Sequence, residues 1–316
     1  MSTGNMTVSS GKYQYKWIED WVKIPDTPSG KTNGRTHGVV VTNENHIVIF
    51  NQAVPAILII DAEGKLINNW GDRFSGAHGL TLVKNNGKEF IWMTDELSGE
   101  VVKTDLEGKA VQSIYRPEIN YYNNGNYSPT WVAECEEEKM GNGNIWVADG
   151  YGSSVVHRYD KQGNYLQTLS GAEGGGRFSC PHSLFIDYRK ADPELYIADR
   201  GNNRFQVYDL EGNFKRTFGA DILGCPCGGI VKDGLLYVPE LCARLAILDE
   251  DDKLISYIGQ NEATCNISTW PNHPKELIQP GKFNSPHHLA VDNNHNIFIV
   301  EWIIGGRITK LEKINN

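Results

Sequence analysis

The sequence predicts an all-β fold, a six-bladed β-propeller closed by its N-terminal strand, and three observations favour this prediction. A four-strand unit recurs along the chain, and its best-preserved copy runs from Cys180 to Gly219. Glycine is abundant, with 33 residues among 316, and no long segment shows a helical period of apolar residues. The last copy lacks a fourth strand, while an isolated strand-like segment stands near the start of the chain.

The best-preserved copy is predicted to form four short strands, at Ser183–Asp187, Leu195–Ala198, Arg204–Tyr208 and Phe214–Phe218. Apolar residues alternate along these segments, as half-buried strands require. The turn Asp209-Leu210-Glu211-Gly212-Asn213 contains the residue types that tight turns favour. The aspartates of the equivalent turns in other copies are therefore expected to be structural.

Each copy begins at one residue of its first strand, called the anchor below. The six anchors are His37, His78, Thr130, His182, Cys227 and His287. They lie 41, 52, 52, 45 and 60 residues apart, a spacing typical of four-stranded blades with loops. The orphan strand Tyr13–Val22 can supply the missing strand of the sixth blade and so remove free sheet edges. We expect one propeller domain over residues 13–316, preceded by a flexible segment at residues 1–12.

Composition excludes several classes of partner. The formal net charge is −9 and no basic stripe is present, so neither nucleic acid nor an anionic membrane is expected to bind. No apolar run reaches the roughly 18 residues of a membrane span. The six cysteines have no zinc-knuckle spacing and favour free thiols, hence a cytoplasmic location. A secreted protein whose signal peptide has been removed is the alternative, and the sequence does not predict the oligomeric state.

Histidines at three alternate anchors are the candidate metal site. First strands line the channel of a propeller, so His78, His182 and His287 would stand about 120° apart and could converge. Three neutral imidazoles with an open position suit a divalent metal, zinc above all. The alternative is that these histidines only satisfy backbone groups near the channel. His37, at the first anchor, is a candidate for a group that supports the ligands, a catalytic base or an ordinary channel histidine.

The ends of the second strands supply a second ring of polar residues. An acid recurs there, at Asp95, Asp149, Asp199, Glu240 and Glu301, and is expected to accept backbone hydrogen bonds at the start of each hairpin. The residues just beyond it differ from blade to blade. Tyr151 is a candidate base, and Arg200 can hold a carboxylate or an oxyanion. The candidates for substrate binding are Gln52, Glu96, Glu240 and Trp302.

The repeats resemble NHL-type propeller repeats, as seen in Pro181-His182-Ser183-Leu184 and the segment from Tyr196 to Tyr208. The stretch from Trp146 to Tyr151, with Pro181-His182 and Ala198-Asp199-Arg200, also resembles the peptidyl-α-hydroxyglycine α-amidating lyase domain. That family is a six-bladed propeller that cleaves a carbinolamide into an amidated peptide and glyoxylate. The resemblance implies a channel metal, usually zinc, on His78, His182 and His287. It further implies Tyr151 as the catalytic tyrosine and Arg200 as an active-site arginine.

This chain departs from the family pattern at four places. Asn51-Gln52 stands where the family has a second arginine, and Ser285 replaces a methionine. His288 replaces the acid that binds a structural calcium, which puts that calcium in doubt. The disulfide partners that flank the family tyrosine are missing, since Gly152 follows Tyr151. The metal ligands and the tyrosine are thus kept while the groups that would hold the substrate have changed.

Three functions are therefore open at the level of sequence. The first is a metal-dependent lyase that breaks a C–N or C–O bond beside a hydroxylated or keto carbon of a small-molecule or peptide-terminal substrate. The second is a metal-dependent hydrolase or isomerase of a small polar, sugar-like substrate. The third is a non-catalytic interaction scaffold, which would have no need of three convergent histidines.

Overall fold

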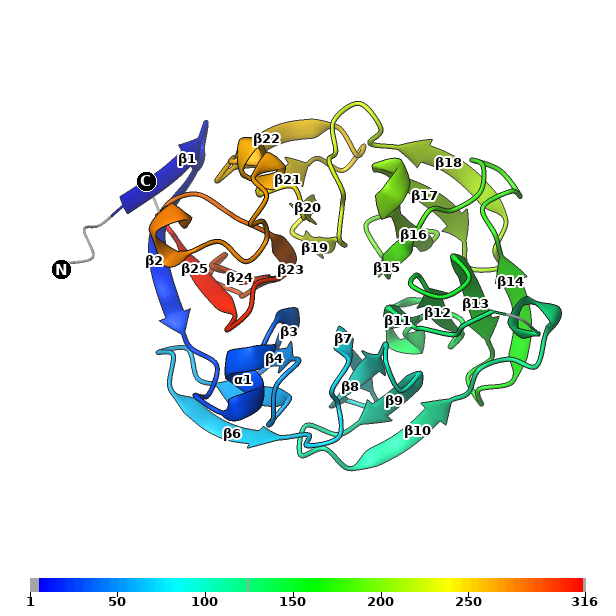
Figure 1. The fold of residues 1–316 in the computed structure, drawn as a ribbon. Helices are drawn as coiled ribbons and strands as arrows, with labels where there is room; N and C mark the ends of the chain where they lie inside the picture. The colour runs from blue at the N-terminus through cyan, green and yellow to red at the C-terminus, as the bar shows by residue number, and fades with distance from the viewer. Residues whose placement is uncertain (1–5, 124, 315–316) are drawn as a thin grey trace. The chain divides into compact units, whose positions relative to one another are not determined.

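The computed structural model describes residues 6–123 and 125–314, and most of their regular secondary structure is β-strand (Figure 1). The strands form six antiparallel sheets, of which five have four strands and one has five among the described residues. The predicted fold class, an all-β six-bladed β-propeller, is confirmed, and each sheet is one blade. No helix in the described part of the chain is long and apolar enough to cross a membrane.

The chain divides into two compact units, which are described separately. The first unit combines the residues up to Arg73 with Ile230–Asn316, and the second unit is Phe74–Gly229. Each contributes three blades. The single domain expected over residues 13–316 stays a prediction.

The second unit holds the blades of the second, third and fourth repeats. Its strands are β7 (Ala77–Asn85), β8 (Lys88–Asp95), β9 (Glu100–Thr104), β10 (Ala110–Ile114), β11 (Trp131–Glu134), β12 (Ile145–Asp149), β13 (Val155–Tyr159), β14 (Tyr165–Leu169), β15 (Pro181–Asp187), β16 (Glu194–Asp199), β17 (Arg204–Asp209) and β18 (Phe214–Phe218). Its 3-10 helices are η1 (Asn120–Tyr122), η2 (Glu137–Lys139) and η3 (Arg200–Asn202).

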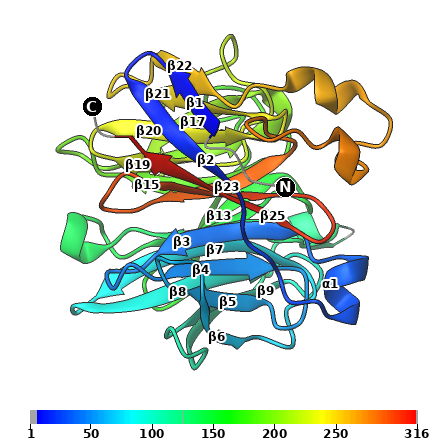
Figure 2. The same ribbon diagram turned by 90° about the vertical axis from the view of Figure 1, so that its left-hand side faces the viewer.

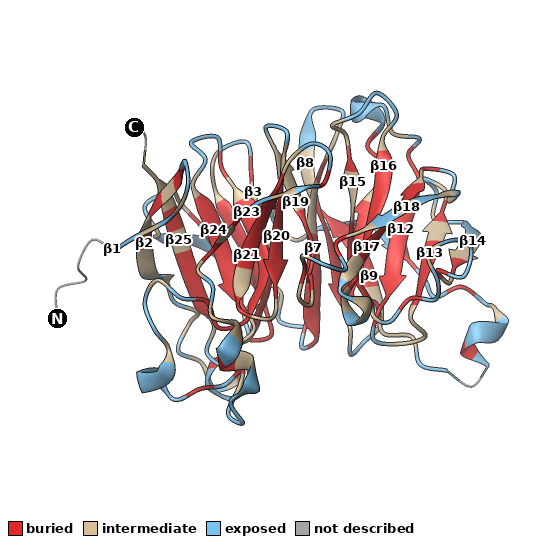
Figure 3. Cartoon of the chain, turned by 90° about the horizontal axis from the view of Figure 1, so that it is seen from above, coloured by how far each residue is buried: buried red, intermediate tan, exposed pale blue. Residues whose placement is uncertain are grey.

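Burial in the second unit follows the order of the strands within each blade. The second strands β12 and β16 are buried along their whole length (Figure 3), whereas the fourth strands β10 and β14 are exposed or half-buried at all but their last residue. Two buried tryptophans, Trp92 and Trp146, fill the cores on either side of the third blade's sheet. Large aromatic side chains bury the most apolar area per residue, so these cores fix the sheets that carry the candidate site.

The first unit holds the blades of the first, fifth and sixth repeats. Its strands are β1 (Met6–Ser10), β2 (Tyr13–Val22), β3 (Thr36–Val41), β4 (Ile47–Asn51), β5 (Ile57–Ile60), β6 (Leu66–Trp70), β19 (Ile230–Lys232), β20 (Leu235–Glu240), β21 (Arg244–Leu248), β22 (Leu254–Ile258), β23 (Pro286–Val291), β24 (Ile297–Glu301) and β25 (Arg307–Lys313). Its helices are α1 (Pro28–Thr32), η4 (Glu262–Asn266) and η5 (Lys275–Leu277).

The N-terminal strand completes the last blade, as the sequence predicted. Strand β2 pairs antiparallel with β25, with Trp17 opposite Leu311. Strand β1 then pairs with the other edge of β2 (Figure 2), so that the sheet runs β1-β2-β25-β24-β23 (Figure 1). The sequence analysis did not anticipate β1, which lies within the segment at residues 1–12 that was expected to be flexible. Residues 1–5 of that segment lie outside the described residues.

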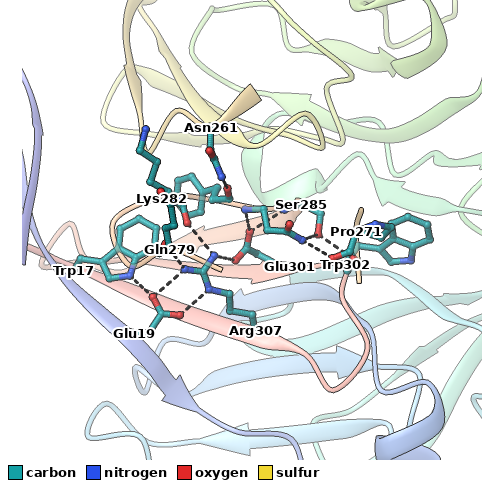
Figure 4. A network of polar contacts seen from close by, with 12 residues as sticks. Trp17, Glu19, Asn261, Pro271, Gln279, Lys282, Ser285, Glu301, Trp302 and Arg307 are labelled. Atoms are coloured by element: carbon teal, nitrogen blue, oxygen red, sulfur yellow. Dashed lines mark hydrogen bonds and ion pairs between the residues drawn. The ribbon is translucent and has the colours of Figure 1, made fainter. Parts of the chain in front are cut away.

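A buried ion-pair network joins the N-terminal strand to the C-terminal strands (Figure 4). Arg307 on β25 is 3% exposed and donates to both carboxylate oxygens of Glu19 on β2, at 2.7 and 2.9 Å. It also donates to Glu301 on β24 at 2.7 Å, and the indole of Trp17 donates to Glu19 at 2.7 Å. Burial alone would lower the pKa of Arg307, but the charges of Glu301 and Glu19 outweigh it and raise that pKa. Arg307 is therefore protonated, and the carboxylates of Glu19 and Glu301 balance its charge inside the sheet.

We predict that R307M destabilises the protein strongly, because it leaves the buried carboxylate of Glu301 without a cation. Breaking one partner of a buried pair typically costs about 3–5 kcal/mol in the free energy of unfolding. The matched control is K16M on the same sheet, which removes the half-exposed pair of Lys16 with Glu312 at 3.5 Å and should cost less than about 1 kcal/mol. Urea unfolding of both variants measures the difference, and equal losses would contradict the role given to Arg307.

Candidate active site

Buried acids at the ends of the second strands position the segments that lead into the anchors. In the second unit, three such acids are fully buried and each accepts a hydrogen bond from a backbone N–H two or three residues before an anchor. The contacts join Asp95 to Gly76 at 2.9 Å, Asp149 to Ser128 at 2.7 Å and Asp199 to Ser179 at 2.7 Å. The structural role predicted for the recurring acid is confirmed for these blades.

The same contact recurs in the last blade of the first unit. Glu301 accepts from the backbone N–H groups of Asn284 and Ser285, at 2.6 and 2.9 Å, just before the anchor His287. Glu240 instead forms an ion pair with Arg244 at 2.9 Å. The ion pair joins the two strands of its own hairpin, and the predicted contact of Glu240 with substrate stays a prediction.

The three histidines predicted to bind metal share one hydrogen-bond pattern. Each is buried, and its Nδ1 contacts the backbone carbonyl of another anchor residue. The contacts are His78 to Thr130 at 2.7 Å, His182 to Cys227 at 2.7 Å and His287 to His37 at 2.9 Å. Because a carbonyl oxygen only accepts, Nδ1 must carry the proton, and Nε2 of the neutral ring keeps its lone pair. This arrangement is typical of histidines that ligate a metal through Nε2.

In the second unit, His78, His182, Tyr151 and Arg200 form one cluster. The rings of His78 and His182 lie 4.8 Å apart, and the ring of Tyr151 lies 5.0 Å from His78. The Tyr151 hydroxyl is 3.1 Å from Nε2 of His78, and Nη1 of Arg200 is 3.3 Å from the same hydroxyl. The structure thus brings together four residues that the sequence analysis selected from three different blades.

The direction of every hydrogen bond in this cluster follows from the tautomer of His78. Since Nε2 of His78 can only accept, the Tyr151 hydroxyl donates to it and accepts from the Arg200 guanidinium. Burial raises the pKa of Tyr151 well above its ordinary value, and the neighbouring charge of Arg200 only partly offsets this effect. The phenol therefore keeps its proton at neutral pH, and its oxygen is held between one donor and one acceptor.

Arg200 has no carboxylate partner among the described residues, although it follows an acid in sequence. Asp199 pairs with Arg204 instead, at 2.9 Å. The Arg200 side chain instead contacts the Tyr151 hydroxyl, the sulfur of Cys180 at 3.4 Å, and the thiol of Cys227. Its positive charge is therefore available to an anionic group of a ligand.

Two cysteines beside Arg200 were not predicted to belong to the site. The thiol of Cys180 is an acceptor for Arg200, and the sulfur of Cys227 lies within 4.8 Å of a ring nitrogen of His182. Burial raises the pKa of Cys227 to about 12, against the opposing charge of Arg200, so its thiol is protonated at neutral pH. The repeat register could have identified both residues, since Cys227 is an anchor and Cys180 stands two residues before one.

In the first unit, His37 and His287 lie side by side. Their rings are 4.5 Å apart and nearly perpendicular, and the carbonyl of His37 accepts from His287. The next residue, His288, contacts the carbonyl of Val39 at 3.1 Å, and burial lowers its pKa to about 4. The position of the expected calcium-binding acid therefore holds a neutral imidazole. A centre that combines His287 with His78 and His182 stays a prediction, since His287 belongs to the first unit.

Gln52 and Trp302, also in the first unit, flank Arg35. Gln52 is buried, and its backbone N–H donates to the carbonyl of Arg35 at 2.9 Å. The guanidinium of Arg35 lies over the ring of Trp302 at 5.5 Å. Their predicted contact with substrate remains a prediction.

Glu96 lines a cavity of about 1030 Å³ that lies wholly within the second unit. The lining residues are 96–101, 113–116, 125–128 and Tyr151. These segments are the β8–β9 turn with the start of β9, the end of β10 with the residues that follow it, and the loop before β11. No single motif in the sequence could therefore have predicted the cavity. A ligand in the cavity would reach the same tyrosine that contacts His78.

Comparison with known proteins supports this fold. A family model described as a 6-bladed beta-propeller, DUF5128, matches residues 132–299, which are 168 of the 316 residues. NHL repeat-containing protein 3 of Homo sapiens is 28% identical over 216 residues, which cover 63% of this chain and 58% of the relative. The probable peptidyl-alpha-hydroxyglycine alpha-amidating lyase pgal-1 of Caenorhabditis elegans is 30% identical over 208 residues, 56% of each chain.

The chain thus spans less than two thirds of the length of both relatives. Among solved structures, streptogramin B lyase superposes with a TM-score of 0.62 at 13% identity, covering 99% of this chain and 100% of that one. At this identity the likeness supports the fold alone.

We predict that D95N weakens both the fold and the alignment of His78. The buried carboxylate accepts from the backbone N–H groups of Gly76, Leu97 and Ser98, and an amide would place its own N–H groups against these donors. The expected loss in unfolding free energy is about 2–4 kcal/mol. The matched control is D105N in the exposed outer turn of the same blade, which should change stability by less than about 1 kcal/mol. A D95N protein as stable as D105N would show that the acid does not anchor the strand.

Proposed function

The chain belongs to DUF5128, the six-bladed β-propeller family, and on this scaffold we propose that it is a metal-dependent lyase that cleaves the C–N bond of a peptide-terminal carbinolamide. One observation carries the proposal. The Tyr151 hydroxyl lies between the guanidinium of Arg200 and Nε2 of His78, at 3.3 and 3.1 Å. The 30% identity to a probable amidating lyase supports the choice of reaction.

We propose that His78, His182 and His287 hold a divalent cation, for which zinc is the best match. The shared contact of Nδ1 with a backbone carbonyl supports this assignment, because it leaves Nε2 of each ring as the electron-pair donor. The part of His287 rests on the alternate-blade register of the sequence. A cation in such a site would act as a Lewis acid that polarises the substrate oxygen and stabilises developing negative charge.

Tyr151 would move the one proton that the reaction requires. As the hydroxyl of the carbinolamide becomes an aldehyde carbonyl, its proton leaves, and the electron pair of the broken C–N bond stays on nitrogen, which takes a proton. The products are a primary amide and glyoxylate, and neither water nor an oxidant is consumed. A phenol that can both donate and accept passes one proton from oxygen to nitrogen and ends unchanged. Arg200 orients this phenol and would hold the carboxylate that leaves as glyoxylate.

We predict that the purified protein contains about one divalent ion and releases glyoxylate from a peptide that ends in α-hydroxyglycine. Chelation should stop the release, H182A should lose the ion, and Y151F should keep the ion while kcat falls about 10²- to 10⁴-fold. Elemental analysis and a glyoxylate assay measure these effects. The control is H295N, which changes a half-exposed histidine in a surface turn and should leave both properties intact.

Each negative result favours one of the other functions. A bound ion without glyoxylate release would favour a hydrolase or isomerase of a small polar substrate. Protein that binds no divalent ion, and that behaves identically after chelation, would favour a scaffold without catalysis.

A further inference from the structure

The cavity beside Tyr151 bears on which substrates the protein accepts. It has a volume of about 1030 Å³, at the upper end of the range for small-ligand pockets. Because Tyr151 is one of its lining residues, a substrate whose reacting end meets the Tyr151 hydroxyl can extend its remaining part into this cavity. The charge and polarity of the other lining residues then determine which substrate side chains bind in the cavity.

Glu96 is one of the two acids in these walls. It is half-buried directly after β8, and its carboxylate accepts a hydrogen bond from the hydroxyl of Ser128 at 3.4 Å. No lysine or arginine among the described residues pairs with it. Burial, with a further contribution from the charge of Asp95, raises the pKa of Glu96. A half-buried acid that lacks a cation is a group that a cationic ligand would stabilise.

The remaining walls fit the same kind of ligand. A second acid, Glu100, lines the cavity, and among the described lining residues only Arg116 is a base. The guanidinium of Arg116 lies over the ring of Tyr122 at 5.4 Å. Tyr115 and Tyr127 add aromatic surface to the lining, which suits the alkyl stem and the charged end of a basic side chain.

We propose that this cavity is a subsite for a lysine or arginine side chain of the substrate, with Glu96 as the carboxylate that pairs with it. The assignment deepens the proposed function and rests on it for the peptide nature of the substrate. The negative charge of Glu96 favours a cationic substrate side chain. The positive charge of Arg116 repels the same side chain and so weakens this preference.

The test compares two N-acetylated dipeptides that end in α-hydroxyglycine and carry either arginine or citrulline before it. Citrulline has nearly the shape of arginine without its charge. We expect the wild-type protein to favour arginine about tenfold in kcat/KM. E96Q should abolish this preference, R116Q should enlarge it, and raising the salt concentration should reduce it. E107Q, in an exposed turn of the same blade, is the matched control and should change nothing.

Calorimetric binding of the corresponding peptides that end in plain glycine separates the subsite from the reaction. Preferential binding of the arginine peptide that depends on Glu96, without glyoxylate release from the hydroxylated form, would uphold the subsite and refute the lyase. Release of glyoxylate with equal use of arginine and citrulline would refute the subsite and uphold the lyase. Opposite effects of E96Q and R116Q are the result that no loss of folding could imitate.

Discussion

The candidate site depends on buried carboxylates that bind the backbone just ahead of the anchors. A buried carboxylate is costly unless its oxygens accept hydrogen bonds, and Asp95, Asp149 and Asp199 meet this need with backbone N–H groups. Each contact fixes where a first strand begins and hence where its anchor side chain lies. The acids also leave their immediate neighbours in sequence at the mouth of the hairpin, where Glu96 and Arg200 stand. A structural requirement and a variable functional position are therefore adjacent along the chain.

The same backbone determines the protonation of the site. The carbonyl of Thr130 holds the proton of His78 on Nδ1, so Nε2 accepts from Tyr151, and the Tyr151 oxygen in turn accepts from Arg200. The main chain thus orients the imidazole of His78, and the imidazole in turn orients the phenol of Tyr151 and the guanidinium of Arg200. The lone pair on Nε2 serves one partner at a time, so binding a cation and accepting the hydrogen bond of the Tyr151 hydroxyl are alternative states of His78. This competition would couple occupation of the site to the freedom of the Tyr151 hydroxyl.

The sequence repeats made the fold and most of the cluster predictable. Features that occur at only one place in the chain could not be predicted. The repeat register selected His78, His182, Tyr151 and Arg200, which the structure brings into one cluster, because each copy uses the same strand positions. Strand β1 was missed because five residues with only two apolar positions, Met6 and Val8, give an alternation too short to predict a strand. The thiol of Cys180 was missed because cysteines were considered only by their spacing. The cavity could not be foreseen, since its walls come from three loops that meet only in the folded chain.

The two units differ in whether their buried charges are paired, and this difference fits a substrate with two charged groups. In the first unit, Arg307 is neutralised by Glu19 and Glu301, so its charge serves the sheet. In the second unit, neither Arg200 nor Glu96 has an ionic partner among the described residues, yet Arg200 touches Tyr151 and Glu96 shares a cavity with it. Groups left in this state cost stability unless a ligand completes them. A peptide that carries a carboxylate at its reacting end and a basic side chain behind it supplies both missing charges at once.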